Sequence, residues 1–304
     1  MRTPLIAILG PTASGKSDLA LCLACQFQGE VVSCDSIQIY KFLDIGTSKV
    51  SREEQRGIPH HLIDLFDPDQ RFTAGQYMLE GRKVLDGIKS RGNLPLVVGG
   101  TGLYLRALLN GLFEGPARSE SLRARLKQWK VSHLHQLLKK VDQDSAQRIF
   151  PRDQPKIIRA LEVFFLTSKT LSSHFQIPTQ QLENFRPIKL GLNPSKDKLY
   201  DRIEDRVDHM FSNGFIEEVE AILKRGFSPT CKPLQSIGYA QSVNYLKGAI
   251  SLSEAITSTK QATRQYAKRQ LTWFRKEKEV TWFNGFGHEE KIENHIKDYL
   301  RQFT

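Results

Sequence analysis

The fold is decided by Gly10-Pro11-Thr12-Ala13-Ser14-Gly15-Lys16-Ser17, which matches the phosphate-loop pattern G-x-x-x-x-G-K-[ST] at every position. The apolar run before it, residues 5–9, predicts a buried strand. After it, Leu19, Leu23 and Phe27 are spaced four apart, as one face of a helix requires. A strand, a glycine-containing loop and a helix in this order form the context in which the pattern has its physical meaning.

The loop predicts a site for a polyphosphate. Gly10 and Gly15 let the backbone turn tightly, so that its N–H groups can face an anion, and the N-terminus of the following helix adds positive potential. Lys16 supplies a mobile charge, and the hydroxyl of Ser17 suits Mg²⁺. A chance match, or a loop that only packs, is the alternative. The motif names neither the nucleotide nor the reaction.

Composition predicts an ordinary globular protein of two domains. The chain has 304 residues, of which 39% are hydrophobic and 25% charged, and no apolar run approaches the length of a membrane span. No signal peptide precedes the first strand, so we expect a cytoplasmic protein that does not enter a membrane. Cys22 and Cys25 have C-x-x-C spacing but no second pair, and we expect both to be small buried residues rather than a redox or metal site.

The positive charge is concentrated in two segments. The net charge is +11, of which residues 118–186 carry +7 and residues 260–278 carry +6, while the rest of the chain sums to −2. Basic helices can be mere solvated faces. Two such segments beside a phosphate loop favour a large polyanionic partner, which points to nucleic acid.

A second strand, residues 30–34, leads directly into Asp35. Ligands of open α/β sheets bind beyond the carboxyl ends of the strands. Asp35 is therefore expected to face the same crevice as Lys16, where a carboxylate could bind Mg²⁺ or accept a proton. A turn or helix-capping role is the alternative.

A further buried strand, residues 94–98, ends in Gly99-Gly100-Thr101-Gly102. Nucleotide hydrolases place an acidic Mg²⁺ ligand in such a position. Its absence weakens an ATPase interpretation and makes the Thr101 hydroxyl a second candidate donor to phosphates, with a plain tight turn as the alternative.

The fold class predicted is α/β, a phosphate-loop parallel sheet flanked by helices, with an all-helical insertion domain. The core domain is expected at 1–117 and 187–304 and the insertion at 118–186.

A later helix carries Arg202 and Arg206 on one face, four residues apart. On the basic helix 261–276, Tyr266, Trp273 and Phe274 are expected to pack. Ser51-Arg52-Glu53-Glu54 resembles a capping box opening a short helix. His60 and His61 are adjacent in an expected strand, so they point to opposite faces and are expected to be structural.

At this point the motifs resemble one family, the tRNA dimethylallyltransferases. The resemblance spans nearly the whole chain and includes the phosphate loop, Asp35-Ser36-Ile37-Gln38-Ile39-Tyr40, Asp44-Ile45-Gly46-Thr47, His61-Leu62-Ile63-Asp64, Val98-Gly99-Gly100-Thr101-Gly102-Leu103-Tyr104, Arg159-Ala160-Leu161-Glu162-Val163, Ile237-Gly238-Tyr239 and Ala267-Lys268-Arg269-Gln270-Leu271-Thr272-Trp273-Phe274. It implies a monomeric bacterial enzyme that moves the dimethylallyl group of dimethylallyl diphosphate to N6 of adenosine 37, beside the anticodon.

The resemblance also implies roles for matching residues. Gly10, Pro11, Thr12, Ala13, Ser14, Gly15, Lys16 and Ser17 would hold the diphosphate, with Mg²⁺ at Ser17. Asp35 would be the general base, and Thr101 and Arg206 would contact the diphosphate, so that the catalytic set is Lys16, Asp35, Thr101 and Arg206. The anticodon stem-loop of tRNA would be contacted by Asp35, Ser36, Ile37, Gln38, Thr101, Arg123, Pro155, Lys156, Ile157, Ile158, Arg159, Gln235, Ser236, Ile237, Gly238, Tyr239 and Ala240.

Three positions depart from the family pattern. Lys156 stands where an arginine is usual, Ser168 replaces a glycine, and Ala240 stands where a basic residue is common. These departures affect tRNA contacts rather than the reaction. Three other classes remain open: a small-molecule phosphate-loop kinase that binds ATP, an adenylate prenyltransferase acting on a free nucleotide, and a non-catalytic RNA-binding protein.

Overall fold

The computed structural model describes residues 2–177 and 179–303. The chain divides into two compact units, which we call unit 1 (Met1–Leu109 and Leu182–Thr304) and unit 2 (Asn110–Gln181). The insertion was expected at 118–186. The chain returns to unit 1 earlier than that, because the Leu182 N–H already donates to the carbonyl oxygen of Leu109 at 2.9 Å.

Unit 1 is built on a six-stranded sheet in which every pair of neighbours is parallel. This confirms the predicted fold class. The strand order is β3-β2-β4-β1-β5-β6, so β1, which leads into the phosphate loop, lies inside the sheet. The strands are β1 (Thr3–Leu9), β2 (Gly29–Ser33), β3 (His60–His61), β4 (Leu94–Gly99), β5 (Phe185–Leu192) and β6 (Val280–Phe283).

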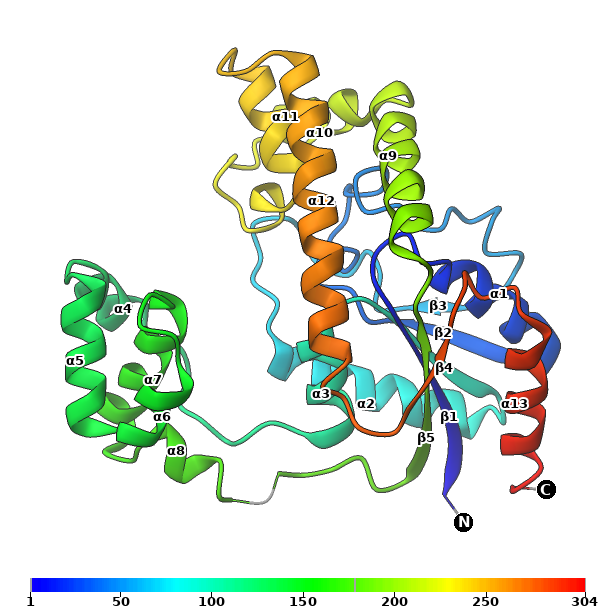
Figure 1. Cartoon of the computed structure of the whole chain (residues 1–304), viewed down its shortest axis with the longest axis horizontal. Helices are drawn as coiled ribbons and strands as arrows, with labels where there is room; N and C mark the ends of the chain where they lie inside the picture. Colours follow the sequence, from blue (N-terminus) through cyan, green and yellow to red (C-terminus); the bar gives the residue numbers. More distant parts are fainter. Residues whose placement is uncertain (1, 178, 304) are drawn as a thin grey trace. The chain divides into compact units, whose positions relative to one another are not determined.

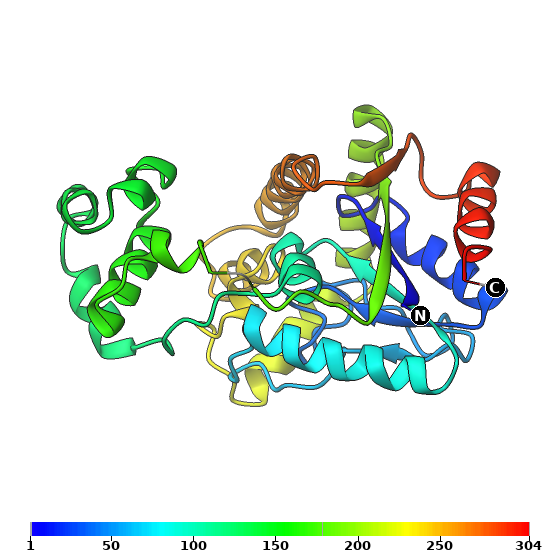
Figure 2. The ribbon, with the colours of Figure 1, turned by 90° about the horizontal axis from the view of Figure 1, so that it is seen from below.

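Helices cover both faces of the sheet, as a parallel sheet requires. Leu19, Leu23, Ile292 and Ile296 pack in one hydrophobic cluster, which places α1 (Lys16–Phe27) and α13 (Glu290–Leu300) on the same face, as Figure 2 shows. The other cluster contains side chains of α2 (Ala74–Ser90), α3 (Gly102–Asn110), α10 (Phe215–Lys224) and α11 (Tyr239–Leu246).

Two long helices, α9 (Lys196–Ser212) and α12 (Leu252–Phe274), rise beyond the carboxyl ends of the strands (Figure 1). They pack together through Leu199, Ile203 and Ala267, with Ala13 of the phosphate loop against the same cluster. This contact fixes the two helices next to the loop. A short 3₁₀ helix, η1 (Pro233–Gln235), precedes α11.

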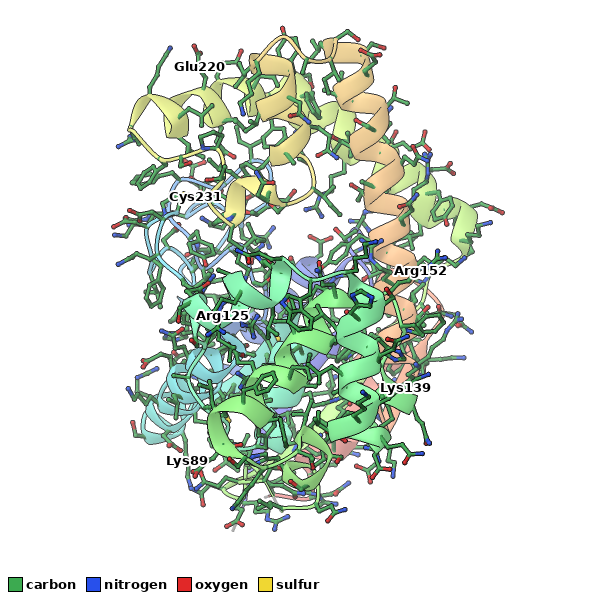
Figure 3. The ribbon with its side chains drawn as sticks, turned by 90° about the vertical axis from the view of Figure 1, so that its left-hand side faces the viewer. Lys89, Arg125, Lys139, Arg152, Glu220 and Cys231 are labelled. Atoms are coloured by element: carbon green, nitrogen blue, oxygen red, sulfur yellow. The ribbon has the colours of Figure 1, made fainter. Side chains whose placement is uncertain are left out.

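Unit 2 is helical, as predicted, and has a core of its own. Its helices are α4 (Glu120–Lys127), α5 (Val131–Val141), α6 (Gln143–Arg148), α7 (Gln154–Thr167) and α8 (Leu171–His174). Leu134, Leu138, Ile157 and Leu161 are fully buried in that core. Figure 3 labels three exposed basic side chains of the unit, Arg125, Lys139 and Arg152.

Several local expectations are corrected. Cys22 and Cys25 are exposed on α1, not buried, because the face that meets the sheet is taken by Leu19, Leu23 and their neighbours. Ser51 and Glu54 form the hydrogen bonds of a capping box, but turns follow rather than a helix.

The histidine pair has the structural roles expected of it. The His61 ring contacts the carboxylate of buried Glu30, with Nε2 and Oε2 2.6 Å apart, and His60 contacts the carbonyl oxygen of Ile58 at 2.9 Å. Over residues 2–177 and 179–303, no helix has the length and apolar character needed to cross a membrane.

Candidate active site

The phosphate loop adopts the geometry that its glycines predict. Gly15 is the N-cap of α1 with φ 86°, a left-handed conformation, and it offers no side chain to cap the helix. A Cβ there would lie 2.0 Å from the Phe286 carbonyl oxygen, so only glycine fits. The first N–H groups of a helix have no partner inside it. The described residues show no hydrogen bond from the N–H groups of residues 16–18, which is an arrangement that suits a phosphate.

Two side chains of the loop are set up for an anion. The Ser14 hydroxyl is fully buried, and the described part of the chain gives it no hydrogen-bond partner. Lys16 donates from Nζ to the Pro11 carbonyl oxygen at 2.6 Å. Burial, helped by the nearby charge of Arg206, lowers the pKa of Lys16 to about 7. An anion in the loop would accept a hydrogen bond from the unpaired Ser14 hydroxyl and would compensate the buried charge of Lys16.

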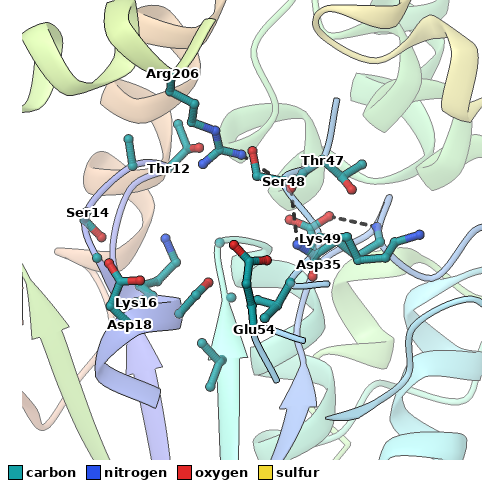
Figure 4. A pocket seen from close by; sticks show the side chains of 18 of the residues that line it. Thr12, Ser14, Lys16, Asp18, Asp35, Thr47, Ser48, Lys49, Glu54 and Arg206 are labelled. Atoms are coloured by element: carbon teal, nitrogen blue, oxygen red, sulfur yellow. Dashed lines mark hydrogen bonds between the residues drawn. The ribbon is translucent and has the colours of Figure 1, made fainter. Parts of the chain in front are cut away.

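The loop opens onto a cavity of about 1040 Å³ in unit 1. Lys16, Asp35 and Arg206 all line it, and Figure 4 shows these three side chains approaching from different elements. Arg206 belongs to α9, and Asp35 follows β2. Lys16 and Asp35, which were expected in one crevice, therefore line the same cavity, and Arg206 lines it as well.

Asp35 has the turn-capping role that was considered as the alternative. Its Oδ1 accepts from the backbone N–H groups of Ile37 and Gln38, at 2.8 and 3.3 Å, so it caps the turn that follows β2. These bonds fix the orientation of the carboxylate. The described residues show no hydrogen bond to Oδ2, which leaves the second oxygen of this cavity-lining residue to accept a proton or a ligand.

Thr101 is not among the residues that line the cavity. Its Oγ1 accepts from the Ser36 N–H at 3.1 Å, and its own N–H donates to the Cys34 carbonyl oxygen at 3.1 Å. Thr101 therefore holds the Asp35 turn in place. Its hydroxyl also interacts with the Tyr266 phenol, and a contact to diphosphate stays a prediction.

Arg206 is held against the loop that carries Asp44-Ile45-Gly46-Thr47. Its Nη2 donates to the Thr47 carbonyl oxygen at 3.4 Å, and burial lowers its pKa. The same carbonyl accepts from Gln38 Nε2 at 3.3 Å. One backbone oxygen thus joins Arg206 to the turn that begins at Asp35.

Glu218 of α10 is a site residue that sequence reasoning missed. Its carboxylate accepts from the backbone N–H groups of Asp44 and Ile45, at 3.0 and 2.6 Å, and from the Tyr239 hydroxyl at 2.7 Å. It fastens the loop whose Thr47 carbonyl oxygen accepts from Arg206. The two segments that Glu218 joins, 44–47 and 237–239, were singled out in the sequence, but no sequence signal pointed to Glu218 itself.

Tyr266 was expected to pack, and this expectation was wrong in part. The side chain is half-buried and lines the cavity. Burial, followed by the charge of Asp35, raises the pKa of its phenol, while the side chains of Thr101 and Gln270 act in the opposite direction. Tyr266 therefore belongs to the wall of the cavity near Asp35. Phe274 is buried, as expected.

Of the residues in unit 1 that were predicted to contact RNA, some are buried and others are accessible. The Tyr239 side chain is buried against the ring of Phe215, 5.0 Å between centroids, and cannot reach a ligand. Gly238 is also buried. Gln235 is exposed, while Ser36, Ile37, Gln38, Ser236, Ile237 and Ala240 are half-exposed. These seven residues are accessible at the surface of unit 1, and their contacts to RNA stay predictions.

The predicted RNA contacts of unit 2 include two arginines with internal partners. Arg123 meets buried Glu162 with two hydrogen bonds, at 2.7 and 2.6 Å, and Arg159 donates to the same carboxylate at 2.7 Å. Ile157 and Ile158 are core residues. Pro155 and Lys156 are exposed at the start of α7, where Lys156 pairs with Asp153 at 2.6 Å. The arginines have a structural role, and any contact of theirs to RNA stays a prediction.

The fold and the site define a phosphate-loop α/β protein with a carboxylate in the cavity that its phosphate loop lines. The IPP transferase family model matches residues 38–277, and the isopentenyl transferase model matches residues 3–66. The chain belongs to the tRNA dimethylallyltransferase family, whose members are prenyl transferases.

Similar proteins cover the chain almost completely. It is 48% identical to a tRNA dimethylallyltransferase of Solibacter usitatus over 99% of both chains, and 46% identical to one of Koribacter versatilis over 96% of both. Among solved structures, a tRNA isopentenylpyrophosphate transferase of Bacillus halodurans is 38% identical, with a TM-score of 0.74 over 99% of this chain and 98% of that one. A eukaryotic dimethylallyltransferase acting on tRNA is 30% identical, with a TM-score of 0.81 over 93% and 74%.

Proposed function

We propose that this chain transfers the dimethylallyl group of dimethylallyl diphosphate to N6 of adenosine 37 in tRNA, and releases diphosphate. In this reaction the bond between C1 of the dimethylallyl group and the diphosphate oxygen breaks. A bond between C1 and N6 forms, and N6 loses one proton. The observation that carries the proposal is that Lys16, Arg206 and Asp35 line one cavity, since the reaction needs cations at the leaving group and a base at the amine.

The donor end of the cavity fits a diphosphate. As the C–O bond lengthens, negative charge grows on the leaving group, and fixed positive groups aimed at it lower the barrier. The N-terminus of α1, the Ser14 hydroxyl, Lys16 and Arg206 are such groups. No γ-phosphate is transferred, which agrees with the glycines and Thr101 after β4 in place of an acidic residue.

The acceptor end of the cavity fits an amine that must lose a proton. Adenine N6 is a poor nucleophile, and Asp35 Oδ2 can accept one of its N–H groups and take the proton as the N–C bond forms. The two bonds to Oδ1 keep the carboxylate aligned during this step. A base in the anticodon loop is stacked, so the enzyme must take adenosine 37 out of the stack to bring N6 here.

Mg²⁺ is the metal that the proposal includes, and the residues present fit a metal that arrives with its ligand. The described residues contain no cluster of three metal-binding side chains. Mg²⁺ is commonly held by one or two protein oxygens together with substrate phosphates. Ser17 at the start of α1 would supply one such oxygen, and the diphosphate the others. When bound, the ion neutralises charge on the leaving group.

Unit 2 is proposed to bind the anticodon stem-loop. Arg125, Lys139 and Arg152 are exposed on three different segments of the unit. Large exposed apolar side chains also occur there, among them Trp129 (54% exposed) and Phe150 (81% exposed). Basic groups for phosphates together with aromatic faces for bases are what a single-stranded RNA loop requires.

The test is nucleoside mass spectrometry of tRNA after incubation with dimethylallyl diphosphate. The expected product is an adenosine heavier by one dimethylallyl group, mapped to position 37, with no consumption of ATP. Lys16→Ala should give none of it. Turnover of ATP without tRNA would favour a kinase, and prenylation of free nucleotide in preference to tRNA would favour an adenylate prenyltransferase.

A further inference from the structure

Gln270 of α12 connects two backbone segments that are far apart in the sequence. The side chain is 5% exposed. Its Oε1 accepts from the Thr12 N–H in the phosphate loop at 2.8 Å, and its Nε2 donates to the Gly100 carbonyl oxygen after β4 at 3.0 Å. One buried amide therefore bridges the phosphate loop and the turn at residues 99–101.

Each end of this bridge leads to a reacting group. Thr12 lies in the loop that ends at Lys16, and both residues line the cavity. On the other side, Gly100 is followed by Thr101, which accepts from the Ser36 N–H, next to Asp35. The Gln270 side chain thus adds a link between the diphosphate site and the carboxylate, beyond the contacts that β4 makes with β1 and β2 in the sheet.

Only an amide satisfies both ends of this bridge. One end needs an acceptor for an N–H and the other needs a donor for a carbonyl oxygen. A carboxylate would face the carbonyl unpaired, and an apolar side chain would leave both backbone groups unpaired in a buried place, which costs free energy. Gly100 leaves the amide its space, because a Cβ there would lie 2.0 Å from Nε2.

We propose that Gln270 is a positioning residue for prenyl transfer, which holds the diphosphate loop and the Asp35 turn at the spacing that the reaction needs. The predicted effect on the turnover rate rests on the proposed function. The predicted effect on diphosphate affinity rests on the phosphate loop alone. Misplacement of reacting groups by about 1 Å can cost on the order of 10²-fold in rate.

The experiment compares Gln270→Met, which keeps the length and removes both hydrogen bonds, with the wild-type chain. Gln265→Met is the matched control, since Gln265 is exposed on the same helix. Three quantities are measured for each: the affinity for inorganic diphosphate without tRNA, the single-turnover rate at saturating dimethylallyl diphosphate, and the melting temperature. Gln270→Asn, one methylene too short to reach both partners, replaces the Met variant if that variant does not fold.

We expect Gln270→Met to weaken diphosphate binding at least fivefold and to slow the single turnover by about 10- to 100-fold per folded molecule, with Gln265→Met unchanged. In an Asp35→Asn background the same substitution should slow the turnover by much less, because the group that it misplaces is no longer a base. A role confined to stability would lower the melting temperature. It would change neither the diphosphate affinity nor the turnover rate per folded molecule, and it would show no dependence on Asp35.

The proposal is overturned if folded Gln270→Met keeps both the diphosphate affinity and the turnover rate within twofold of the wild type. Failure of the proposed function is a different result. In that case the wild-type chain itself prenylates no tRNA, while the affinity for inorganic diphosphate still tests the role of Gln270.

Discussion

The ammonium group of Lys16 donates to the carbonyl oxygen of Pro11, 2.6 Å away, within its own phosphate loop. Lys16 is thus held by the loop that it serves, inside a cavity where Arg206 lies nearby. The pKa of about 7 follows from burial first and from that neighbouring charge second. A bound diphosphate would place negative charge beside the Lys16 ammonium group and so favour its protonated form. Binding of the donor and protonation of Lys16 are therefore linked.

This linkage predicts proton uptake when diphosphate binds above pH 7. The free enzyme loses the Lys16 proton as pH rises through about 7, while the bound anion holds it, so affinity should fall by up to tenfold per pH unit above pH 7. Calorimetry in buffers of different ionisation enthalpy counts the protons. Lys16→Arg stays charged and serves as the control for the ionisation of diphosphate itself. Equal proton uptake by both proteins would contradict the linkage.

The same pKa gives the sign of a stability effect. The pKa of Lys16 falls from 10.5 in the unfolded chain to about 7 on folding, so between these values the unfolded state binds more protons. The contribution of Lys16 to the stability of the ligand-free enzyme therefore rises with pH across that window. Below pH 7 its charge is a cost, and diphosphate should offset this cost by raising the melting temperature.

Glu218→Ala should release the loop at residues 44–47. The carboxylate holds the N–H groups of Asp44 and Ile45 and the Tyr239 hydroxyl, and its loss should lower the free energy of unfolding by about 1–3 kcal/mol. Because the loop's Thr47 carbonyl holds Arg206, KM for dimethylallyl diphosphate should also rise. Glu217→Ala, exposed in the same first turn of α10, is the control. If stability falls and KM does not change, the loop does not position Arg206.

The sequence allowed the phosphate loop and the strands around it to be predicted, because β1, β2 and β4 are largely buried runs and the loop has a fixed pattern. Asp35 could be placed because the carboxyl ends of parallel strands share one edge. β6 was missed, since all four of its residues are only partly buried and show no alternation. Glu218 and Gln270 act on backbone groups distant in sequence, which no local pattern reveals. Glu218 lies beside Glu217 and Glu220 and looks like any acid of an amphipathic helix.

Glu162 is a buried carboxylate of unit 2 that joins three of its segments. Glu162 is fully buried and accepts from Arg123, Arg159 and the Ser119 N–H. These partners outweigh burial and lower its pKa to about 2. Its stabilising contribution is complete above pH 4.5, the value for the unfolded chain, and is lost as pH falls towards 2.

Glu162→Gln should therefore destabilise unit 2 by about 3–5 kcal/mol at neutral pH, the usual cost of removing one partner from a buried ion pair. Hydrogen exchange of the amides of α4 and α7 measures this locally. The control is Glu120→Gln, whose pair with Arg118 is exposed and should matter by less than about 1 kcal/mol. Equal protection of the amides in both variants would remove the structural role of Glu162.

Binding of tRNA should weaken steeply with salt. Each phosphate contact contributes about −0.7 to −0.9 to the slope of log affinity against log salt, so several basic residues of unit 2 predict a slope of several units. Arg125→Ala, Lys139→Ala and Arg152→Ala should each make the slope shallower by about this amount when the residue contacts a phosphate. Lys83→Ala, paired with Glu80 on α2, should leave it unchanged. A slope near zero would exclude unit 2 as the binding surface.

The central claim is that Asp35 takes the proton from N6 while the phosphate loop holds the leaving group. The most direct test is the single-turnover rate of Asp35→Asn with saturating tRNA and dimethylallyl diphosphate, beside a melting curve of the same preparation. The amide keeps an acceptor oxygen for the N–H groups of Ile37 and Gln38 but is not basic. We predict a rate lower by about 10²–10⁴-fold, the usual contribution of a positioned base, with tRNA affinity and melting temperature nearly unchanged. A well-folded Asp35→Asn enzyme that reacts at a near-normal rate would contradict the account.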